Sequence, residues 1–321
     1  MHAISYVLPL RAGAPRPELV PYLEWLVDHV DDVLVVDGSV PPVFAAHAAM
    51  FPAGLRHLAV DEPRVTPMGK VGGVLTGVAH ARHDAVVIAD DDVRHDDRSL
   101  RTVVGHLGEA DVVRPQNYFT ELPWHAWWDT GRTLLNRVTG GDWPGTLAVR
   151  RTALERTGGY AGDVLFENLE LVRTLRAAGG REYVAFGCFV ARTPPTSRHF
   201  AGQRVRQAAD ELARPARLLA ELALLPAMVV GGRRALLVTI AASMIVAEAG
   251  RRRAGGRDVF PWATTLAAPC WLLERAVTVW LAVGARAREG GVRYGDTLLP
   301  HAATPMRVLR ARALRHAPAV R

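Results

Sequence analysis

Three consecutive aspartates, Asp90, Asp91 and Asp92, follow the apolar run Ala85–Ala89. A continuous apolar run of this length is typical of a parallel strand that is buried on both faces. In extended backbone, residues i and i+2 point to the same side, so Asp90 and Asp92 can converge on one ion while Asp91 points elsewhere. Carboxylate oxygens suit Mg²⁺ or Mn²⁺, which are usually shared with substrate phosphates. The triplet therefore predicts a metal site, although an isolated Asp-rich turn is more often a solvated loop.

Two further polar groups are predicted near the same edge of the sheet. Asp37 ends the apolar run Val33–Val36, and a carboxylate there can accept hydrogen bonds from a ribose or a base edge. Lys70 is the only lysine in the chain, and with Gly69 it opens a predicted helix, a position that suits anions. Ligand sites of open parallel sheets lie beyond the carboxyl ends of the strands. These positions therefore indicate a site for a charged ligand.

Strand and helix signals alternate along the first two thirds of the chain. Apolar side chains recur at helical spacing over residues 17–30, and further helices are expected near 41–50 and 70–82. A short strand is expected near 55–60. Strands that alternate with short helices predict βαβ units and a parallel sheet. The expected fold class is α/β, with a mostly parallel sheet and flanking helices.

Length and composition exclude several classes of protein. A chain of 321 residues has room for about two domains. Its 49% hydrophobic and 22% charged residues exclude a disordered chain. With two cysteines, neither a disulfide scaffold nor a thiolate metal cluster is available.

The net charge of +7 is unevenly distributed. Residues 1–214 sum to −3 and residues 215–321 to +10. A basic segment beside apolar helices favours an anionic membrane surface over nucleic acid. Since no nucleic-acid-binding motif is visible, no nucleic acid is expected as a partner.

Three apolar segments lie in the basic part: Leu218–Gly232, Ala235–Gly250 and Phe260–Gly284. The first two would be only about 22–24 Å long as helices, against a hydrocarbon core of about 30 Å. The third is long enough but contains Glu274 and Arg275. We expect membrane attachment by short or re-entrant helices, with at most one real span. A soluble helical subdomain is the alternative.

The expected organisation is therefore a catalytic domain at 1–214 and a membrane-associated helical region with an Arg-rich tail at 215–321. The N-terminus has no signal-peptide pattern, so the catalytic domain is expected on the cytoplasmic side of a membrane. Trp124 and Trp128 share a helix face and Trp127 flanks them. This cluster could grip a lipid interface, stack on a sugar or pack in the core.

The order of these motifs resembles the nucleotide-binding half of family 2 glycosyltransferases with a GT-A fold. Four stretches resemble that family's successive landmarks: Leu8-Pro9-Leu10, Val36-Asp37-Gly38-Ser39, Gly69-Lys70 and the Asp-x-Asp of Asp90 and Asp92. Downstream, Gly145–Tyr160 resembles the acceptor-side strand and helix, and Phe166–Leu171 the segment with the catalytic base. Gln203–Gln207 is similar to the Gln-x-x-Arg-Trp motif of the branches that are processive or glycosylate lipids.

The resemblance implies a transfer, with inversion, of a sugar from a nucleotide diphosphate sugar to a hydroxyl. It implies Glu167 as the base and Asp90 and Asp92 as ligands of Mg²⁺ or Mn²⁺. The residues it implies for donor binding are Pro9, Asp37, Lys70, Asp90, Asp91, Gln203 and Arg206. Because apolar helices follow the last motif, the implied acceptor is a membrane lipid or lipid-linked molecule.

Two positions depart from the family pattern. Asn168 stands where an Asp is usual, and an amide cannot act as a base at neutral pH. The base is then Glu167, or Glu170 in a shifted register, or Asp142. Gln207 replaces the usual Trp of the last motif. Two other functions remain open from sequence: a metal-dependent nucleotidyltransferase of similar fold, and a catalytically silent membrane scaffold.

Overall fold

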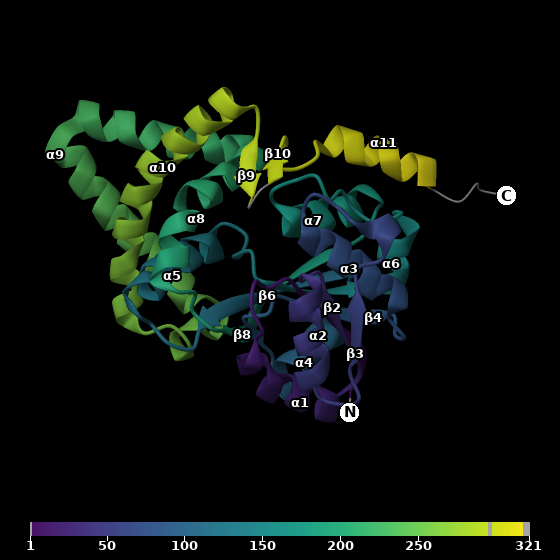
Figure 1. Cartoon of the computed structure of the whole chain (residues 1–321). Coiled ribbons are helices and arrows are strands. Elements are labelled where there is room, and N and C mark those ends of the chain that lie inside the picture. Colours follow the sequence, from purple (N-terminus) through teal and green to yellow (C-terminus); the bar gives the residue numbers. More distant parts are fainter. Residues whose placement is uncertain (1, 295–296, 317–321) are drawn as a thin grey trace. The chain divides into compact units, whose positions relative to one another are not determined.

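The computed structural model of the chain is shown in Figure 1 and describes residues 2–294 and 297–316. Residues 1, 295–296 and 317–321, which include the end of the expected Arg-rich tail, lie outside the described residues. The chain packs into two compact units. The first unit comprises Met1–Pro115, Pro144–Ala185 and Thr304–Arg321, and the second comprises Gln116–Trp143 and Phe186–Ala303.

One sheet of eight strands runs in the order β3-β2-β1-β4-β7-β6-β8-β5. The strands are β1 (His2–Leu10), β2 (Val30–Asp37), β3 (Arg56–Ala59), β4 (Ala85–Ala89), β5 (Val93–Arg94), β6 (Val112–Phe119), β7 (Thr146–Arg150) and β8 (Glu182–Arg192). Strands β1 to β4 pair in parallel, whereas β7 is antiparallel to β4 and β6. The expected α/β class with a mostly parallel sheet is confirmed.

Helices flank this sheet within the first unit (Figure 1). They are α1 (Val20–His29), α2 (Pro41–Met50), α3 (Gly69–His80), α4 (Asp97–His106), α6 (Arg151–Arg156), α7 (Glu167–Ala177) and α11 (Met306–His316). Two short 3₁₀ turns, Pro17–Leu19 and Glu62–Arg64, precede α1 and α3. The helices expected near 41–50 and 70–82 are therefore present, and the one expected over 17–30 opens with a 3₁₀ turn.

Helix α3 lies close against β1 because glycines face the strand. A Cβ added at Gly77 would come within 2.3 Å of Val7 Cγ1, and one at Gly73 within 3.0 Å of Pro9 Cβ. Side chains at these positions would push the helix away from the sheet. The close approach fixes the N-terminal end of α3, where Lys70 lies.

The carboxyl ends of the central strands lie at one edge of the sheet. Register pairs Leu10 at the end of β1 with Asp37 at the end of β2, and Val7 of β1 with Ile88 of β4. Asp37 and Asp90 therefore lie at the carboxyl ends of β2 and β4. This is the edge where parallel sheets bind their ligands.

The second unit contains the larger helices, α5 (Trp124–Val138), α8 (Ser197–Ala209), α9 (Pro215–Arg252) and α10 (Ala267–Glu289). It also contains a hairpin of β9 (Val292–Tyr294) and β10 (Thr297–Leu299), and the 3₁₀ turns Asp210–Ala213, Arg253–Asp258 and Trp262–Leu266. Leu134, Ala247, Phe260 and Ala268 form a buried cluster between these elements. Gly131 and Gly250 allow close approach, since a Cβ at Gly250 would lie 2.0 Å from the Leu134 carbonyl oxygen.

The two compact units follow the packing of the chain and cross residue 214, and the division into a catalytic domain and a membrane-associated region stays a prediction. Helix α5 and the ends of β6 and β8 pack with the helices that follow that residue, whereas residues 304–316 pack in the first unit. The physical reason is a set of polar contacts that α5 makes with distant residues. Trp127 Nε1 donates to the Ala263 carbonyl oxygen at 3.1 Å, and Trp128 Nε1 donates to Glu274 at 3.0 Å.

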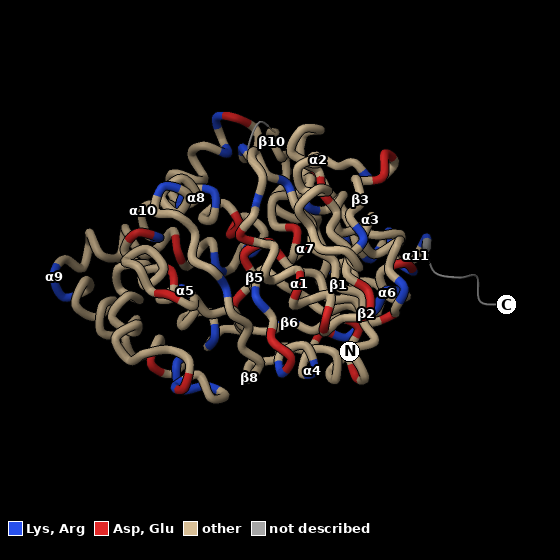
Figure 2. Tube along the Cα trace, turned by 60° about the horizontal axis from the view of Figure 1, so that its bottom comes forward, with Lys and Arg blue, Asp and Glu red and all other residues tan. Residues whose placement is uncertain are grey.

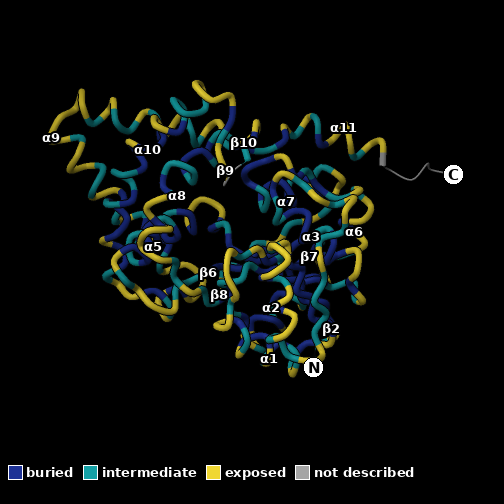
Figure 3. The backbone as a smooth tube through the Cα atoms, viewed as in Figure 1, coloured by how far each residue is buried: buried dark blue, intermediate teal, exposed yellow. Residues whose placement is uncertain are grey.

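Helix α9 contains a sharp bend at Gly232, whose φ of 55° and ψ of −145° are not helical. The bend separates two arms, residues 215–231 and 233–252, which correspond to the first two apolar segments of the sequence. Figure 2 shows basic residues at the bend and long uncharged stretches on either side, and Figure 3 shows that much of α9 is exposed. Val229 and Val230, beside the bend, are 74% and 90% exposed.

Two stretches are long and apolar enough to cross a membrane, judged by length and composition alone: Pro215–Asp258 and Trp262–Glu289. The most apolar window of the first is only 6% buried, and that of the second is 50% buried. The second stretch contains α10, and two of its charged residues, Glu274 and Arg275, make contacts or are buried within the second unit. Glu274 accepts from Arg204 at 2.9 Å, and Arg275 is 1% exposed.

Candidate active site

Lys70 joins two carboxylates that are far apart in the sequence. It is the second residue of α3, and its ammonium Nζ lies 2.6 Å from Asp90 Oδ1 and 2.8 Å from Glu167 Oε1. Asp90 follows β4, and Glu167 is the first residue of α7. The structure thus brings together a predicted metal ligand, the predicted base and the single lysine, all within the first unit.

The charges of this group stabilise one another. Burial alone would lower the pKa of Lys70, but the charges of Asp90 and Glu167 outweigh burial and raise it well above its ordinary value. The ammonium therefore stays protonated at every physiological pH. It offers a fixed cation beside two acids, which is an arrangement that can bind a phosphate oxygen or hold a carboxylate in place.

The Asp triplet is positioned by its backbone and by a glycine. The Asp90 amide donates to the Gly145 carbonyl oxygen at 2.8 Å, and a Cβ at Gly145 would lie 2.8 Å from Asp90 Oδ2. Asp90 binds Lys70, whereas Asp91 Oδ2 lies 2.8 Å from Arg16 Nη1. All three aspartates are partly exposed. Neighbouring carboxylates with oxygen donors at the end of a strand fit a small hard cation.

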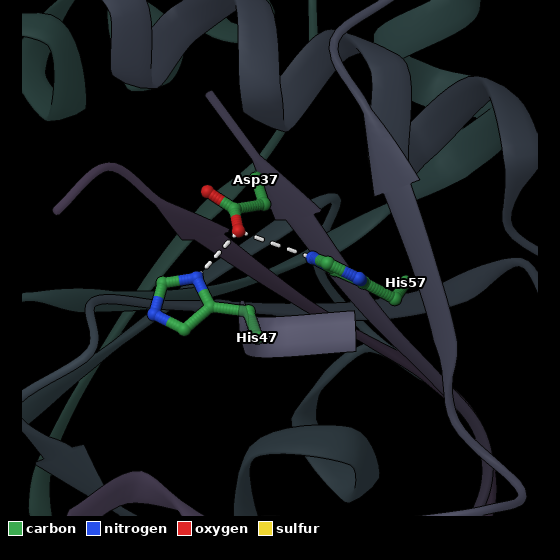
Figure 4. Close-up of side chains that lie close together, drawn as sticks. All are labelled: Asp37, His47 and His57. Atoms are coloured by element: carbon green, nitrogen blue, oxygen red, sulfur yellow. Dashed lines mark hydrogen bonds and ion pairs between the residues drawn. The ribbon is translucent and has the colours of Figure 1, made fainter. Parts of the chain in front are cut away.

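Asp37 is surrounded by groups that donate to its carboxylate (Figure 4). Its Oδ2 lies 2.6 Å from His47 Nδ1 and 3.1 Å from His57 Nε2, and its Oδ1 accepts from the Ser39 amide at 2.9 Å. Burial works to raise the pKa of Asp37, but these hydrogen bonds outweigh burial and hold it far below its ordinary value. The Asp37 side chain has no exposed surface, so contact with a donor base or ribose stays a prediction.

Three carboxylates are candidates for the catalytic base, and two of them are buried and hydrogen-bonded to other groups of the protein. Asp142, in the second unit, is 2% exposed and accepts from Arg132, Thr133 and Asn136 at 2.8–2.9 Å. Glu170 is fully buried and accepts from the Thr304 amide at 2.7 Å. The Glu167 side chain is 15% exposed. Access to an acceptor therefore favours Glu167.

Asn168 has a structural contact that the usual Asp could not make. Its Nδ2 donates to the Pro144 carbonyl oxygen at 3.0 Å. A carboxylate has no hydrogen to donate to that oxygen. The departure from the family pattern at Asn168 thus serves the packing of α7.

Gln203 and Arg206 lie on α8 in the second unit. The Arg206 guanidinium donates to Gln203 Oε1, and it lies 5.5 Å from the centre of the Tyr294 ring. Gln207 accepts from Arg204 at 3.1 Å. The expectation that Gln203 and Arg206 join the donor site stays a prediction. Pro9 lies within β1, paired with Val36, and its contact with a donor also stays a prediction.

Several contacts of this region were not predicted from sequence. In the first unit, Arg16 contacts Asp91, and His47 and His57 contact Asp37. In the second unit, a network of ion pairs joins Asp129, Arg132, Arg204 and Glu274. Only the spacing of Asp129 and Arg132, three residues apart on one helix, is a signal that sequence offers. The other partners are distant in sequence.

We expect the network of Asp129 to make the protein sensitive to acid. Burial raises the pKa of the Asp129 carboxyl, but Arg132 and Arg204 outweigh burial and lower it from 3.8 to about 2. A lowered pKa stabilises the folded state above the unfolded value, and that stability is lost as pH falls through the folded value. Thermal unfolding should therefore shift to lower temperature between about pH 4 and pH 2. In Asp129→Asn this part of the pH dependence should disappear, and its persistence would assign the effect to other carboxylates.

Known proteins resemble this chain in its fold and in part of its sequence. Residues 24–159 match the model of glycosyl transferase family 2. The mannosyltransferase PcManGT from Pyrobaculum calidifontis, solved with GDP-Man and Mn²⁺, is 19% identical with a TM-score of 0.51, and the match covers 86% of each chain. Glucosyl-3-phosphoglycerate synthase from Mycobacterium tuberculosis, solved with Mn²⁺ and UDP-glucose, is 20% identical with a TM-score of 0.40, covering 62% of this chain and 74% of that one. A search of curated proteins finds no match.

The fold is the α/β GT-A-like fold, with long C-terminal helices added to it. Residues 24–159, which are less than half of the chain, match the model of glycosyl transferase family 2, and this match is the basis of the function proposed below. The partial match favours a glycosyltransferase over the nucleotidyltransferase and the silent scaffold considered from sequence.

Proposed function

We propose that the enzyme transfers a hexose, with inversion, from a nucleotide diphosphate sugar to a hydroxyl of a membrane lipid or lipid-linked acceptor. One observation carries the proposal: Lys70 holds Asp90 and Glu167 within 2.8 Å of its ammonium at the carboxyl edge of the sheet. Sugar transfer needs positive charge beside the leaving diphosphate and a base beside the acceptor hydroxyl. This cluster offers a candidate for each role. The products would be a glycosylated acceptor and a nucleoside diphosphate.

Asp90 and Asp92 are the residues that would hold a divalent ion. Their oxygen donors fit Mg²⁺ or Mn²⁺, and PcManGT was solved with Mn²⁺ beside GDP-Man. When bound, such an ion would offset the negative charge that grows on the leaving diphosphate. Lys70 stands next to Asp90 and would add a second positive charge. That Arg206, on α8 in the second unit, also binds the donor stays a prediction.

Glu167 would accept the proton of the acceptor hydroxyl. A general base must lie within hydrogen-bond reach of the proton it removes, and Glu167 begins a helix with its side chain partly exposed. One base with direct displacement at the anomeric carbon gives inversion. In the resting protein, the contact of 2.8 Å with Lys70 Nζ orients the Glu167 carboxylate.

Exposed apolar side chains of the second unit support a membrane-bound acceptor. On α9 they are Leu219, Val229, Val230, Leu237, Val238 and Ile245, and on or near α10 they are Trp262, Val277, Trp280 and Leu281. Large exposed apolar surfaces mark membrane or protein contacts, and we propose a membrane contact here. The arms of α9 would be about 25 and 30 Å long, against a hydrocarbon core of about 30 Å, and we propose that the bend at Gly232 makes them a re-entrant pair. We propose that the catalytic residues face the cytoplasm.

The double substitution Val229→Asp and Val230→Asp should weaken membrane binding, because it places two charges at the exposed bend of α9. We expect at least about a ten-fold loss of flotation with vesicles of phosphatidylglycerol and phosphatidylethanolamine, since a charge in hydrocarbon costs about 2.5–3.5 kcal/mol. Val65→Asp is the matched control, because Val65 is 68% exposed in the first unit. Equal flotation of the double variant and the control would show that α9 does not enter the lipid.

The reaction is tested by product analysis. Radiolabelled nucleotide sugars, including GDP-mannose and UDP-glucose, are incubated with the enzyme, Mn²⁺ and membranes from the source organism. The proposal expects label in the organic extract and release of a nucleoside diphosphate. Label confined to the aqueous phase would exclude a lipid acceptor, and release of pyrophosphate would indicate nucleotidyl transfer.

A further inference from the structure

The cluster at the end of β2 connects Asp37 to a loop that carries an arginine. His47 receives a hydrogen bond at Nε2 from the Arg16 amide, at 3.2 Å, while its Nδ1 lies 2.6 Å from Asp37 Oδ2 (Figure 4). Because an N–H can donate only to an unprotonated nitrogen, Nε2 holds the lone pair and Nδ1 holds the proton. His47 is therefore a neutral tautomer that links a backbone amide to a buried carboxylate.

This tautomer argues against a metal ion in the cluster. Asp37, His47 and His57 offer three ligand atoms within 4.8 Å of one another, which is close enough for a metal. A metal on His47 Nδ1 would move the proton to Nε2, where it would face the Arg16 N–H. The separation of 2.6 Å between Oδ2 and Nδ1 is that of a charge-assisted hydrogen bond. Asp37, His47 and His57 therefore form a structural support that is held together by hydrogen bonds.

The support holds both ends of the loop between β1 and the 3₁₀ turn at Pro17. At one end, the Ala12 amide donates to Ser39 Oγ at 2.9 Å, and the Ser39 amide in turn donates to Asp37. At the other end, the Arg16 amide donates to His47. The buried Asp37 carboxylate thus fixes residues 12–16 through two intermediates.

The loop presents the Arg16 guanidinium beside the Asp triplet. Nη1 lies 2.8 Å from Asp91 Oδ2, and Nε donates to Glu18. The Arg16 side chain is one-third exposed. A guanidinium has five N–H donors, so the contacts with Asp91 and Glu18 leave donors for another anion. Arginine binds phosphate oxygens in pairs, which makes a diphosphate a suitable ligand here.

We propose that Arg16 binds the diphosphate of the sugar donor and that His47 is a positioning residue that sets Arg16 for this contact. The proposal rests on the proposed function, because it assumes a nucleotide diphosphate donor beside Asp90 and Asp92. It also gives the buried Asp37 a role through the loop that does not require direct contact with the donor.

The experiment is a double-mutant cycle in the full-length protein with Arg16→Gln, His47→Phe and the double variant. The His47 ring stacks on Phe51 with centroids 5.0 Å apart. Phenylalanine keeps an aromatic ring at position 47 and removes both hydrogen bonds. GDP and UDP, each with Mn²⁺, are titrated by calorimetry. Each single variant should weaken binding of the preferred nucleotide about ten-fold, as expected for one charge-assisted contact. The double variant should be no weaker than Arg16→Gln. Normal binding by Arg16→Gln, or losses that multiply in the double variant, would overturn the proposal.

Hydrogen exchange supplies a readout that does not depend on the donor. In His47→Phe, amide exchange should accelerate about ten-fold or more in the peptide that contains Arg16 and should stay unchanged in the β-strands. Unchanged exchange at Arg16 would remove the positioning role of His47. If wild type binds neither nucleotide, the proposed function and the role of Arg16 fail together, while exchange still decides whether His47 holds the loop.

A second variant guards against misfolding of His47→Phe. Ser39→Ala, at a half-buried position, frees the Ala12 end of the loop without altering the core. It should weaken nucleotide binding in wild type and have no further effect in Arg16→Gln. A Zn²⁺ titration completes the test, because stoichiometric Zn²⁺ binding that His47→Phe abolishes would overturn the assigned tautomer.

Discussion

Glu167→Gln is expected to abolish sugar transfer while donor binding is retained. The substitution keeps the size of the side chain and its ability to accept a hydrogen bond from Lys70, whose Nζ lies 2.8 Å from Oε1. It removes the basicity needed to take a proton from the acceptor, and loss of a general base typically costs 10²- to 10⁴-fold in rate. Initial rates with labelled donor measure the first effect, and calorimetry with nucleoside diphosphate and Mn²⁺ measures the second.

Glu170→Gln is the matched control, because it makes the same change three residues further along α7. Glu170 accepts from the Thr304 amide and is fully buried, so its loss should alter stability more than turnover. Turnover of Glu167→Gln at the wild-type rate would remove Glu167 as the base. The role would then pass to Glu170 or Asp142.

Asp92→Asn is expected to remove metal-dependent transfer. An amide lacks the negative charge that makes a carboxylate a strong ligand of a hard divalent cation. We expect a loss of at least about 100-fold in rate, comparable to the removal of one electrostatic group from an active site. Rates measured across a Mn²⁺ titration should show no recovery within the solubility of the metal.

The same assay has an internal check in the wild-type enzyme. Addition of EDTA should stop transfer, and excess Mn²⁺ or Mg²⁺ should restore it. Full activity of wild type in EDTA would contradict the metal role of Asp90 and Asp92. Unfolding of Asp92→Asn at the wild-type temperature would exclude general destabilisation as the cause of a lost rate.

Much of the fold was predictable because its signals are local. The buried strands Val30–Asp37 and Ala85–Ala89 appear in sequence as apolar runs, and α3 follows from its spacing and its start at Gly69. The division of the chain at residue 214 was a weaker prediction. Helix α5 belongs with α10 through contacts such as Trp128 with Glu274, which lie 146 residues apart and have no local signature.

The acidic residues of the candidate site were predictable from sequence, whereas the residues that contact them were not. Acids at strand ends are visible in sequence, and the topology brings strand ends to one edge. The imidazoles around Asp37 come from α2 and β3, ten and twenty residues further on, and Arg16 comes from a loop before α1. Such contacts depend on how the elements pack, so no spacing rule reveals them.

If α9 enters a membrane and the acceptor is a lipid, as proposed above, the bend at Gly232 has a consequence for the fate of the product. A helix that turns back within one leaflet leaves both of its ends on the same face of the bilayer. An enzyme attached in this way provides no passage to the opposite face, so a glycosylated lipid would stay in the leaflet where it was made. Any later use of that lipid on the far side would require a separate flippase.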